Sequence, residues 1–505
     1  MVSHTISLFN YGIYSDVFIR IFRSRRMVLF IIFYTLLLDN FLLTALVPII
    51  PDYLIEKDKE QLKQTLRGYH LKVFDNRTSL QIVVNRTQYI NFTGNFSNSP
   101  DVGGRFSIVQ DIFSIPLNKL NENTRVGWLL SSKAIVQLMF NFLVGPFTNR
   151  CGYVIPVFVG CLIIMLSACL FIFGETYIPL FMARSLHGLG SACVTIAGMG
   201  MIADKYPEDK ERSKAMGIAM GGSAAGVLAG YPLGGCMYIY IGKFAPFLLI
   251  VVLTAIDSVL LVLFLRSNTA EQLSESGKSI WKLVQDPYIL LVSGAIMLTT
   301  IALSSLEPTV PIWIMQTMNA EKWQIGLAFV PDSVGYLIGT NGFGVIARSL
   351  GRWICTLCCM LIIGLCCFFL PFASSISQLI MPHFGIGLGL GITDAALMPL
   401  LALLVDRRHN GVYGGVYSIS QIAVCLAYAL GPSISGHVVK SYGFVTLLRS
   451  IAVVNILYAP LCWFLRDVST GTESAAILSH TQKGNSKYTD DEDSGNFSYH
   501  RFENE

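Results

Sequence analysis

Two short segments, GPFTNRCGY beginning at Gly145 and GVIARSLGR beginning at Gly344, decide the fold because they are copies of one pattern. Each follows an apolar stretch with a turn rich in glycine and basic residues, and the two lie 199 residues apart. A glycine-proline run repeats at nearly the same interval, since YPLGG around Pro232 corresponds to GPSIS around Pro432. The chain is therefore expected to contain two copies of one unit.

A second pair of matching segments locates an insertion in the first copy. VPIIP at Pro48 corresponds to VPIWI at Pro311, but these prolines lie 263 residues apart, 64 more than the paired glycines. An extra segment of that size is expected to follow Pro48 and to have no counterpart in the second copy.

Composition identifies the chain as a polytopic membrane protein. Of its 505 residues, 53% are hydrophobic and 13% are charged, and the mean hydropathy is +0.57. Soluble domains carry roughly 25% charged residues, so this chain cannot cover a surface that faces water. A cytosolic enzyme, a secreted disulfide scaffold and a disordered chain are excluded, and a net charge of +4 is too small to indicate nucleic-acid binding.

Twelve apolar stretches reach the roughly 20 residues that a membrane-crossing helix needs. The first contains Asp39 and lacks a small-residue cleavage site, so it is not a signal peptide. The predicted spans are 27–50, 126–148, 154–173, 177–203, 215–238, 244–265, 288–316, 324–347, 354–373, 378–404, 412–438 and 445–465. They give six-helix halves at 27–266 and 288–466, an N-terminal segment 1–26, a linker 267–287 and a disordered polar tail 467–505.

Basic residues in the short loops predict that both termini are cytoplasmic, because Lys and Arg concentrate on that side of a membrane. The long loop 51–124 then faces the lumen. It contains four glycosylation sequons and no cysteine. The predicted glycosylation sites are Asn76, Asn85, Asn91 and Asn95.

Five charged side chains lie well inside predicted spans, where each costs at least about 2.5–3.5 kcal/mol at the bilayer centre. They are Asp39, Lys133, Arg184, Glu307 and Asp394. Structural ion pairs are one reading of this set. With three acids and two bases, however, one carboxylate lacks a partner, and a desolvated carboxylate binds a proton near neutral pH. The set therefore favours a carrier in which protons and an organic cation compete for the same acids, and aromatic rings in nearby spans could hold an ammonium group.

Two six-span copies with these glycine and basic turns resemble the major facilitator superfamily of secondary transporters. One departure is Asn149, where that superfamily's gate motif usually has Asp. Further segments resemble the vesicular amine transporters over about residues 27–480: LLLDNFLLTALVPIIP, NTRVGWLLSSKAIVQL, LFMARSLHGLGS, LEPTVPIWIMQTM and DAALMPLLALLVDRRHNGVYGGVYSI. Within that family the second half looks like the monoamine branch. The fold class is thus an all-α polytopic membrane protein with the major facilitator fold, twelve transmembrane helices in two six-helix halves.

The resemblance implies a proton-coupled antiporter that loads cationic monoamines, of the serotonin, dopamine, noradrenaline and histamine class, into acidic secretory or synaptic vesicles by alternating access. It implies no enzyme activity, no cofactor and no metal, and a monomer. It also assigns roles to residues. Asp39, Asn40 and Glu307 would meet the amine, Trp313, Tyr336 and Tyr428 would line an aromatic pocket, Lys133 and Arg184 would belong to a polar network, and Asp394 would couple protons.

Four departures from the family pattern stand out. The span 11 acid that usually pairs with the span 2 lysine is Gln421, so Lys133 needs a new neighbour, for which Asp39 is the best candidate. Asp332 is an extra acid where a small apolar residue is usual. The cysteines of the family's lumenal disulfide are missing. The family's serine cluster after Arg184 is reduced to Ser191 and Thr195, and this reduction argues against a preference for catechol amines.

The tail carries the pattern of an acidic dileucine signal, which predicts that sorting adaptors bind it. The residues are Glu473, Ile477 and Leu478. Three alternatives remain: a vesicular acetylcholine transporter, a broader drug/proton antiporter, and a receptor or membrane enzyme. The last would need a nucleophile or metal set at suitable spacing, and His187 is a lone histidine that fits packing or a polar network better.

Overall fold

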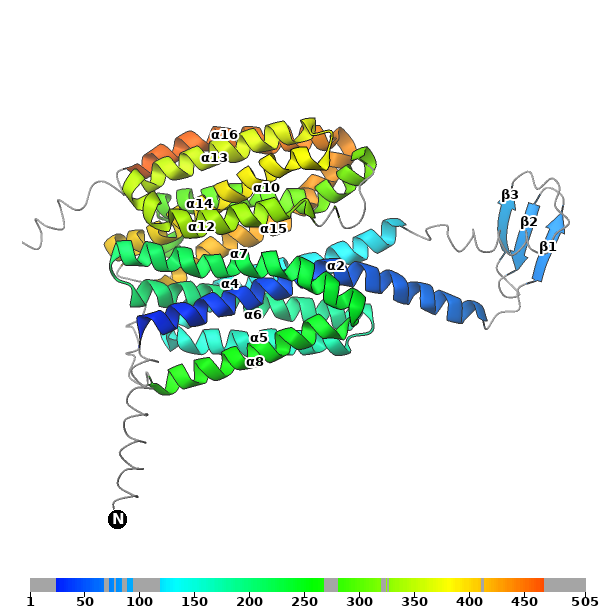
Figure 1. Ribbon diagram of the computed structural model, residues 1–505, viewed down its shortest axis with the longest axis horizontal. Coiled ribbons are helices and arrows are strands. Elements are labelled where there is room, and N and C mark those ends of the chain that lie inside the picture. The colour runs from blue at the N-terminus through cyan, green and yellow to red at the C-terminus, as the bar shows by residue number, and fades with distance from the viewer. Residues whose placement is uncertain are drawn as a thin grey trace, which may run out of the picture.

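The computed structural model describes residues 24–67, 72–76, 79–83, 89–93, 119–267, 280–318, 324, 327–409 and 413–466. Long helices dominate these residues, and they run side by side in one bundle (Figure 1). The first half comprises α2 (Arg25–Arg67), α4 (Lys119–Cys151), α5 (Val154–Phe173), α6 (Tyr177–Lys205), α7 (Asp209–Tyr240) and α8 (Phe244–Ser267).

The second half repeats this arrangement after a short connecting helix. Its elements are α9 (Ile280–Val284), α10 (Pro287–Met318), α12 (Val330–Leu350), α13 (Arg352–Phe369), η1 (Leu370–Phe372), α14 (Ile376–Arg408), α15 (Tyr413–Tyr442), α16 (Phe444–Tyr458) and η2 (Ala459–Leu465). Among the described helices, eleven are long and apolar enough to cross a membrane. The eighth predicted span corresponds to α12, which is less apolar because it carries Asp332 and Arg348.

Helix contacts confirm the internal repeat. In the first half α2 packs on α7, α6 packs on both α4 and α5, and α5 packs on α8. The second half has the same set, with α10 on α15, α14 on both α12 and α13, and α13 on α16. The halves meet through two matching contacts, α4 with α15 and α7 with α12. The 199-residue offset in sequence is thus an offset between equivalent helices.

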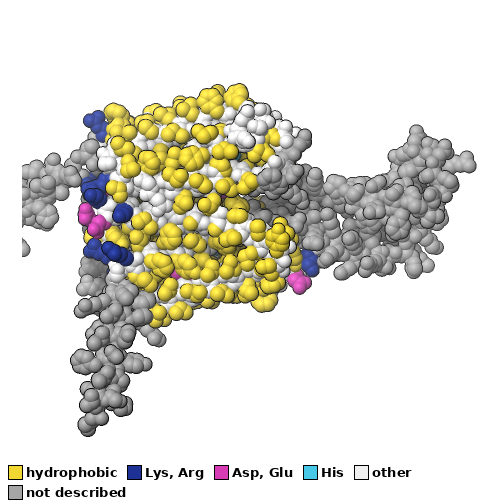
Figure 2. Space-filling model, in the orientation of Figure 1, with side chains coloured by type: hydrophobic (Ala, Val, Ile, Leu, Met, Phe, Trp, Pro, Cys, Tyr) yellow, Lys and Arg dark blue, Asp and Glu magenta, His cyan; other side chains and the backbone are white. Residues whose placement is uncertain are grey.

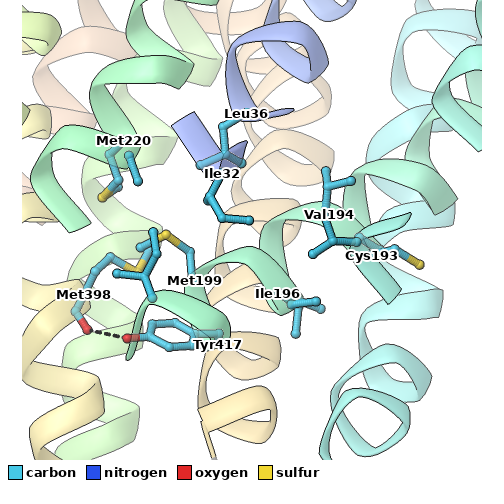
Figure 3. Close-up of a cluster of buried hydrophobic side chains, with 14 of the residues drawn as sticks. Ile32, Leu36, Cys193, Val194, Ile196, Met199, Met220, Met398 and Tyr417 are labelled. Atoms are coloured by element: carbon cyan, nitrogen blue, oxygen red, sulfur yellow. Dashed lines mark hydrogen bonds between the residues drawn. The ribbon is translucent and has the colours of Figure 1, made fainter. Parts of the chain in front are cut away.

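Apolar side chains lie both inside the bundle and on its sides. The space-filling view shows hydrophobic side chains over the sides and Lys and Arg gathered at one end (Figure 2). Inside, a cluster joins five helices across the boundary between the halves, and its members include Ile32, Leu36, Val194, Met199, Met220, Met398 and Tyr417 (Figure 3). The Tyr417 hydroxyl donates to the Met398 carbonyl at 3.2 Å. An apolar outer surface on a packed core is what a bilayer-spanning bundle requires.

The predicted lumenal loop 51–124 contains more regular structure than the sequence indicated. Helix α2 continues through the polar stretch that ends at Arg67, and α4 begins at Lys119 rather than in the middle of the 120s. Between them β1 (Lys72–Asn76), β2 (Ser79–Val83) and β3 (Tyr89–Thr93) form an antiparallel sheet in the order β1-β2-β3. The 43 residues of α2 span about 65 Å at 1.5 Å per residue, so its second part extends beyond a hydrocarbon core of about 30 Å.

Candidate functional site

A buried polar cluster in the first half is centred on Asp39 of α2. Ser191 donates a hydrogen bond to Asp39 Oδ2 at 2.7 Å, and His187 Nε2 lies 3.0 Å from Asp39 Oδ1. Lys133 Nζ of α4 lies 3.8 Å from Asp39 Oδ2. All four side chains are buried, so the carboxylate is balanced by an ammonium group and two hydrogen-bonding groups rather than by water.

Helix geometry explains how α6 contributes to this cluster. Arg184, His187 and Ser191 follow one another at intervals of three and four residues, which places them on one face of α6. Gly188 lets that face approach α4 closely, because a side chain there would collide with the Lys133 carbonyl. The close contact of the two helices places Lys133 beside the same carboxylate.

Arg184 connects the first-half cluster to the second half. Its side chain is 3% exposed, and its Nε and Nη1 atoms have no hydrogen-bond partner among the described residues. The guanidinium interacts electrostatically with Asp39 of α2 and with Glu307 of α10. Arg184 is therefore a buried cation that acts electrostatically on one carboxylate of each half, without an ion pair to either among the described residues.

A second group of acids lies in the second half. Tyr336 of α12 donates a hydrogen bond to Asp394 Oδ2 of α14 at 3.0 Å. Glu307 interacts electrostatically with Asp332 of α12 and with Tyr428 of α15. Asp332 is buried, and its Oδ1 accepts no hydrogen bond from the described residues. The structure thus groups most of the second-half residues that the resemblance assigned to the site with Asp332, the extra acid that departs from the family pattern.

Two expected site residues have different neighbours. The Asn40 amide donates to the Leu36 carbonyl of its own helix at 2.9 Å. Trp313 stacks on Phe444 with ring centroids 4.6 Å apart, in a hydrophobic cluster of α10, α13 and α16. Trp313 therefore packs between helices in this conformation instead of lining a pocket with Tyr336 and Tyr428.

The remaining predicted sites fall at the margins of the described residues. Asn76 is the last residue of β1, and Asn91 lies within β3. Asn85 and Asn95 lie outside the described residues, as do the predicted sorting residues Glu473, Ile477 and Leu478.

His187, which the sequence assigned to packing or a polar network, belongs to the network because it contacts Asp39. Sequence reasoning missed one participant. Asp257 of α8 is a further buried charge within a predicted span. It accepts hydrogen bonds from Thr35 at 2.7 Å and from Cys161 at 3.3 Å, while its Oδ1 has no partner among the described residues. The acid in LTAIDSVLLV was the available signal for Asp257.

The expected new partner for Lys133 is the one that the structure provides. Asp39 lies within ion-pair distance, and no second carboxylate does so among the described residues. Cys425 of the neighbouring helix α15 interacts electrostatically with Lys133 and accepts a hydrogen bond from Asn141 at 3.5 Å. Gln421 lies one turn before Cys425, and no hydrogen bond joins it to the lysine among the described residues.

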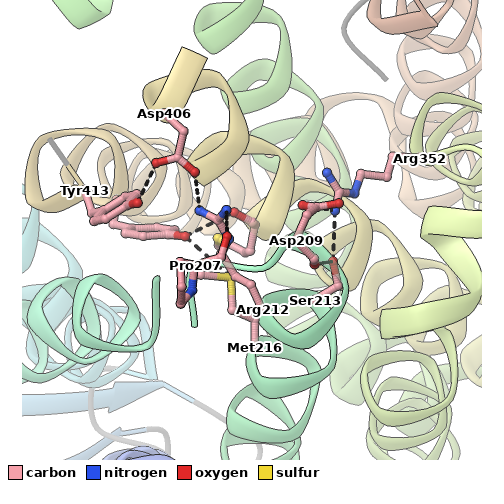
Figure 4. A network of polar contacts seen from close by, with 10 residues as sticks. Pro207, Asp209, Arg212, Ser213, Met216, Arg352, Asp406 and Tyr413 are labelled. Atoms are coloured by element: carbon pink, nitrogen blue, oxygen red, sulfur yellow. Dashed lines mark hydrogen bonds and ion pairs between the residues drawn. The ribbon is translucent and has the colours of Figure 1, made fainter. Parts of the chain in front are cut away.

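Ion pairs between the halves gather at the end of the bundle where Lys and Arg side chains concentrate (Figure 2). We call it the basic end, and the helix ends there carry Arg212, Arg348, Arg352, Arg407 and Arg408. Arg212 of α7 donates to Asp406 of α14 at 2.6 Å, and Tyr413 donates to the same carboxylate at 2.5 Å (Figure 4). Asp209 of α7 pairs with Arg352 at 2.7 Å and with Arg348 at 3.0 Å. These contacts hold the halves together at the basic end.

Glycines allow the two halves to touch at this end. A side-chain carbon at Gly145 of α4 would lie 2.7 Å from Ser418 Cβ of α15, and one at Gly344 of α12 would lie 2.8 Å from the Ser213 carbonyl of α7. Asn149, where the resemblance led us to expect Asp, accepts a hydrogen bond from the Gly414 backbone amide at 3.1 Å. The repeated glycine segments therefore form matching contacts between the halves, and the protein is closed at its basic end.

Comparisons with known proteins agree with this architecture. The family model described as Major Facilitator Superfamily matches residues 106–423 and 295–483. The solved structure of the human organic anion transporter MFSD10 (TETRAN) superposes with a TM-score of 0.67 at 16% identity, covering 87% of this chain and 99% of that one. At this identity the likeness concerns the fold alone.

Curated relatives are much closer in sequence. The synaptic vesicular amine transporter of Homo sapiens is 43% identical over 471 residues, which cover 90% of this chain and 91% of that protein. The chromaffin granule amine transporter of Homo sapiens is 42% identical over 474 residues, 90% of each chain. The vesicular acetylcholine transporter of Rattus norvegicus is 37% identical over 461 residues, which cover 90% of this chain and 85% of that protein. The chain therefore belongs to the vesicular amine transporter family of the Major Facilitator Superfamily, whose members are transporters and not enzymes.

Proposed function

We propose that this protein is a proton-coupled antiporter that loads cationic monoamines from the cytosol into acidic vesicles by alternating access. The observation that carries the proposal is the set of buried carboxylates in both halves, with Arg184 interacting with Asp39 on one side and Glu307 on the other. The names of the relatives at 42–43% identity support the amine and the vesicle.

The charges give a physical basis for exchange. In the membrane interior a carboxylate is stable only when a cation or a proton compensates it. An ammonium group and a proton can each compensate Glu307, so one replaces the other. Asp39 is already engaged by Lys133, His187 and Ser191, which leaves Glu307 as the first contact for an arriving amine. Asp394, which accepts a hydrogen bond from Tyr336, is the proposed proton-coupling carboxylate.

We further propose that the basic end faces the cytosol. Positively charged loops favour that side, and both described ends of the chain lie there: Arg25 pairs with Glu211 at the start of α7, and Trp463 of η2 packs on Trp353 at the start of α13. With the gate closed at this end, the present conformation would release amine to the lumen and take up protons. Opening toward the cytosol would require the contacts of Asp209 and Arg212 to separate.

Contacts of α6 bear on which monoamine is preferred. Ser191 donates to Asp39, and Thr195 donates to the Ser191 carbonyl at 2.7 Å. Neither hydroxyl is then available to donate to a catechol in this conformation. We therefore propose that amines without a catechol, such as serotonin and histamine, are better substrates than dopamine and noradrenaline.

Uptake of labelled serotonin into proteoliposomes tests the amine site. Glu307→Gln keeps the size of the side chain but removes its charge, so uptake should fall to background. Glu208→Gln is the matched control, because Glu208 is exposed and makes no side-chain cap contact at the start of α7. Wild-type transport by Glu307→Gln at equal protein abundance would refute the assignment. Competition by acetylcholine stronger than competition by serotonin would favour the acetylcholine carrier instead.

A further inference from the structure

Asp332, in the first turn of α12, is a buried acid for which the proposed function gives no role. Its side chain is 6% exposed, and its Oδ1 atom accepts no hydrogen bond within the described residues. No Lys, Arg or His of that part of the chain lies within ion-pair distance. The charged group that acts on Asp332 is another carboxylate, that of Glu307.

Packing holds Asp332 on the side of α12 that faces the other acids. Gly387 of α14 lies against the Asp332 backbone, where no side chain could fit, and this contact fixes the start of α12 on α14. Tyr336 lies one turn after Asp332 and donates to Asp394 of α14. Asp332 also interacts electrostatically with Tyr231 of α7 and Tyr428 of α15. This carboxylate therefore acts on tyrosines of both halves.

The compensation of charge leaves Asp332 as the exception. Lys133 lies beside Asp39, and Tyr336 donates to Asp394. Arg184 acts on Glu307 by electrostatic attraction, without an ion pair among the described residues. Asp332 has none of these. A singly charged amine at Glu307 would leave it uncompensated, whereas a second positive charge on the same substrate would compensate it.

We propose that Asp332 forms a second cation subsite, and that this transporter takes aliphatic diamines and longer polyamines, whose second ammonium group binds Asp332. This inference rests on the proposed function, since it places the first ammonium at Glu307. The chemistry required of the substrate is two protonated amines joined by a flexible apolar chain. A proton on Asp332 is the competing occupant, and it would make no distinction between mono- and diamines.

The test uses the full-length protein in proteoliposomes with an acidic interior. Uptake of serotonin is measured first, and then its inhibition by n-alkylamines and by α,ω-diamines of equal chain length. Wild type should be inhibited more strongly by diamines, with an optimum at one chain length. Asp332→Asn should weaken diamine inhibition by about 30-fold, the effect of truncating one partner of a buried charge pair, and should affect alkylamine inhibition far less. Glu208→Gln should leave both unchanged.

Each outcome decides between the claims. If diamines inhibit serotonin uptake by wild type no more strongly than alkylamines at every chain length, the second subsite is overturned. This result holds even if Asp332→Asn fails to fold. Equal losses for both inhibitors in Asp332→Asn would also overturn it and would indicate a proton at this carboxylate. Failure of wild type to take up serotonin under any gradient would instead refute the proposed function.

Discussion

Lys133 Nζ lies 3.8 Å from Asp39 Oδ2, so the span 2 lysine pairs with an acid of its own half. The family resemblance pairs this lysine with an acid of span 11, where this chain has Gln421. A buried ammonium without a carboxylate would be costly, and Asp39 compensates it. In this protein the charge of α4 is therefore balanced within the first half, and no ion pair through Lys133 ties that half to α15.

Lys133→Ala should destabilise the protein by about 3 kcal/mol, because it leaves the buried Asp39 carboxylate without its cation. Asp39→Asn in the same molecule removes the charge that needs compensation, so the double variant should be more stable than Lys133→Ala alone. Thermal unfolding in detergent measures both. A double variant that unfolds below the single variant would show that the pair does not stabilise the fold as described.

The close contact at Gly145 should be required for closing the basic end. Gly145→Ala would bring its Cβ against Ser418, and overpacking of this kind costs about 1–3 kcal/mol, which lowers the population of the closed state by about tenfold. A Ser418→Cys reporter should then react faster with a membrane-impermeant thiol reagent applied at the basic end. Gly342→Ala is the control, since a Cβ at Gly342 meets no atom within 4 Å. Equal labelling in both variants would contradict the gate.

The segment between α2 and α4 should carry glycans and should not depend on disulfides. Glycosidase should lower the apparent mass, and replacing Asn76, Asn85, Asn91 and Asn95 by Gln should abolish that shift. Because residues 51–124 contain no cysteine, mild reductant should leave transport unchanged. A loss of transport in reductant would show that cysteines elsewhere in the chain form a required bond.

Lys243, in the turn between α7 and α8, should make the free energy of unfolding vary with pH in the alkaline range. Burial lowers the pKa of Lys243 to about 8, against the opposing effect of the nearby Glu175 carboxylate. The ammonium donates to the Gly174 carbonyl and lies 4.1 Å from the centroid of the Tyr53 ring. Because its unfolded pKa is about 10.4, the unfolded state binds more protons between about pH 8 and 10, and stability should rise across that window.

The control for this pH effect is Lys440→Met, at an exposed position near the end of α15. Lys243→Met should flatten the rise in thermal unfolding temperature between about pH 8 and pH 10. Lys440→Met should retain that rise. A rise of equal size in both variants would assign the pH effect to other groups.

Much of the fold and site could be predicted from the repeat and the buried charges. Close contact between helices requires glycine at fixed positions, and a charge inside the membrane is costly enough to stand out in the sequence. Matching glycines at Gly145 and Gly344 correspond to real contacts between halves. The helical extension of α2 was missed because a search for membrane spans ends where apolar residues end, although EKDKEQLKQTLR is rich in good helix formers. The positions of Trp313 and His187 depend on how helices rotate against their neighbours, which periodicity does not determine.

The central claim is that a proton gradient drives amine uptake through the buried carboxylates. Purified protein in proteoliposomes with an acidic interior should accumulate serotonin, and a protonophore or an ionophore that collapses the pH gradient should stop the accumulation. Asp394→Asn should prevent accumulation even with the gradient intact. Uptake by wild type that continues at full rate after the gradient has collapsed would contradict the account.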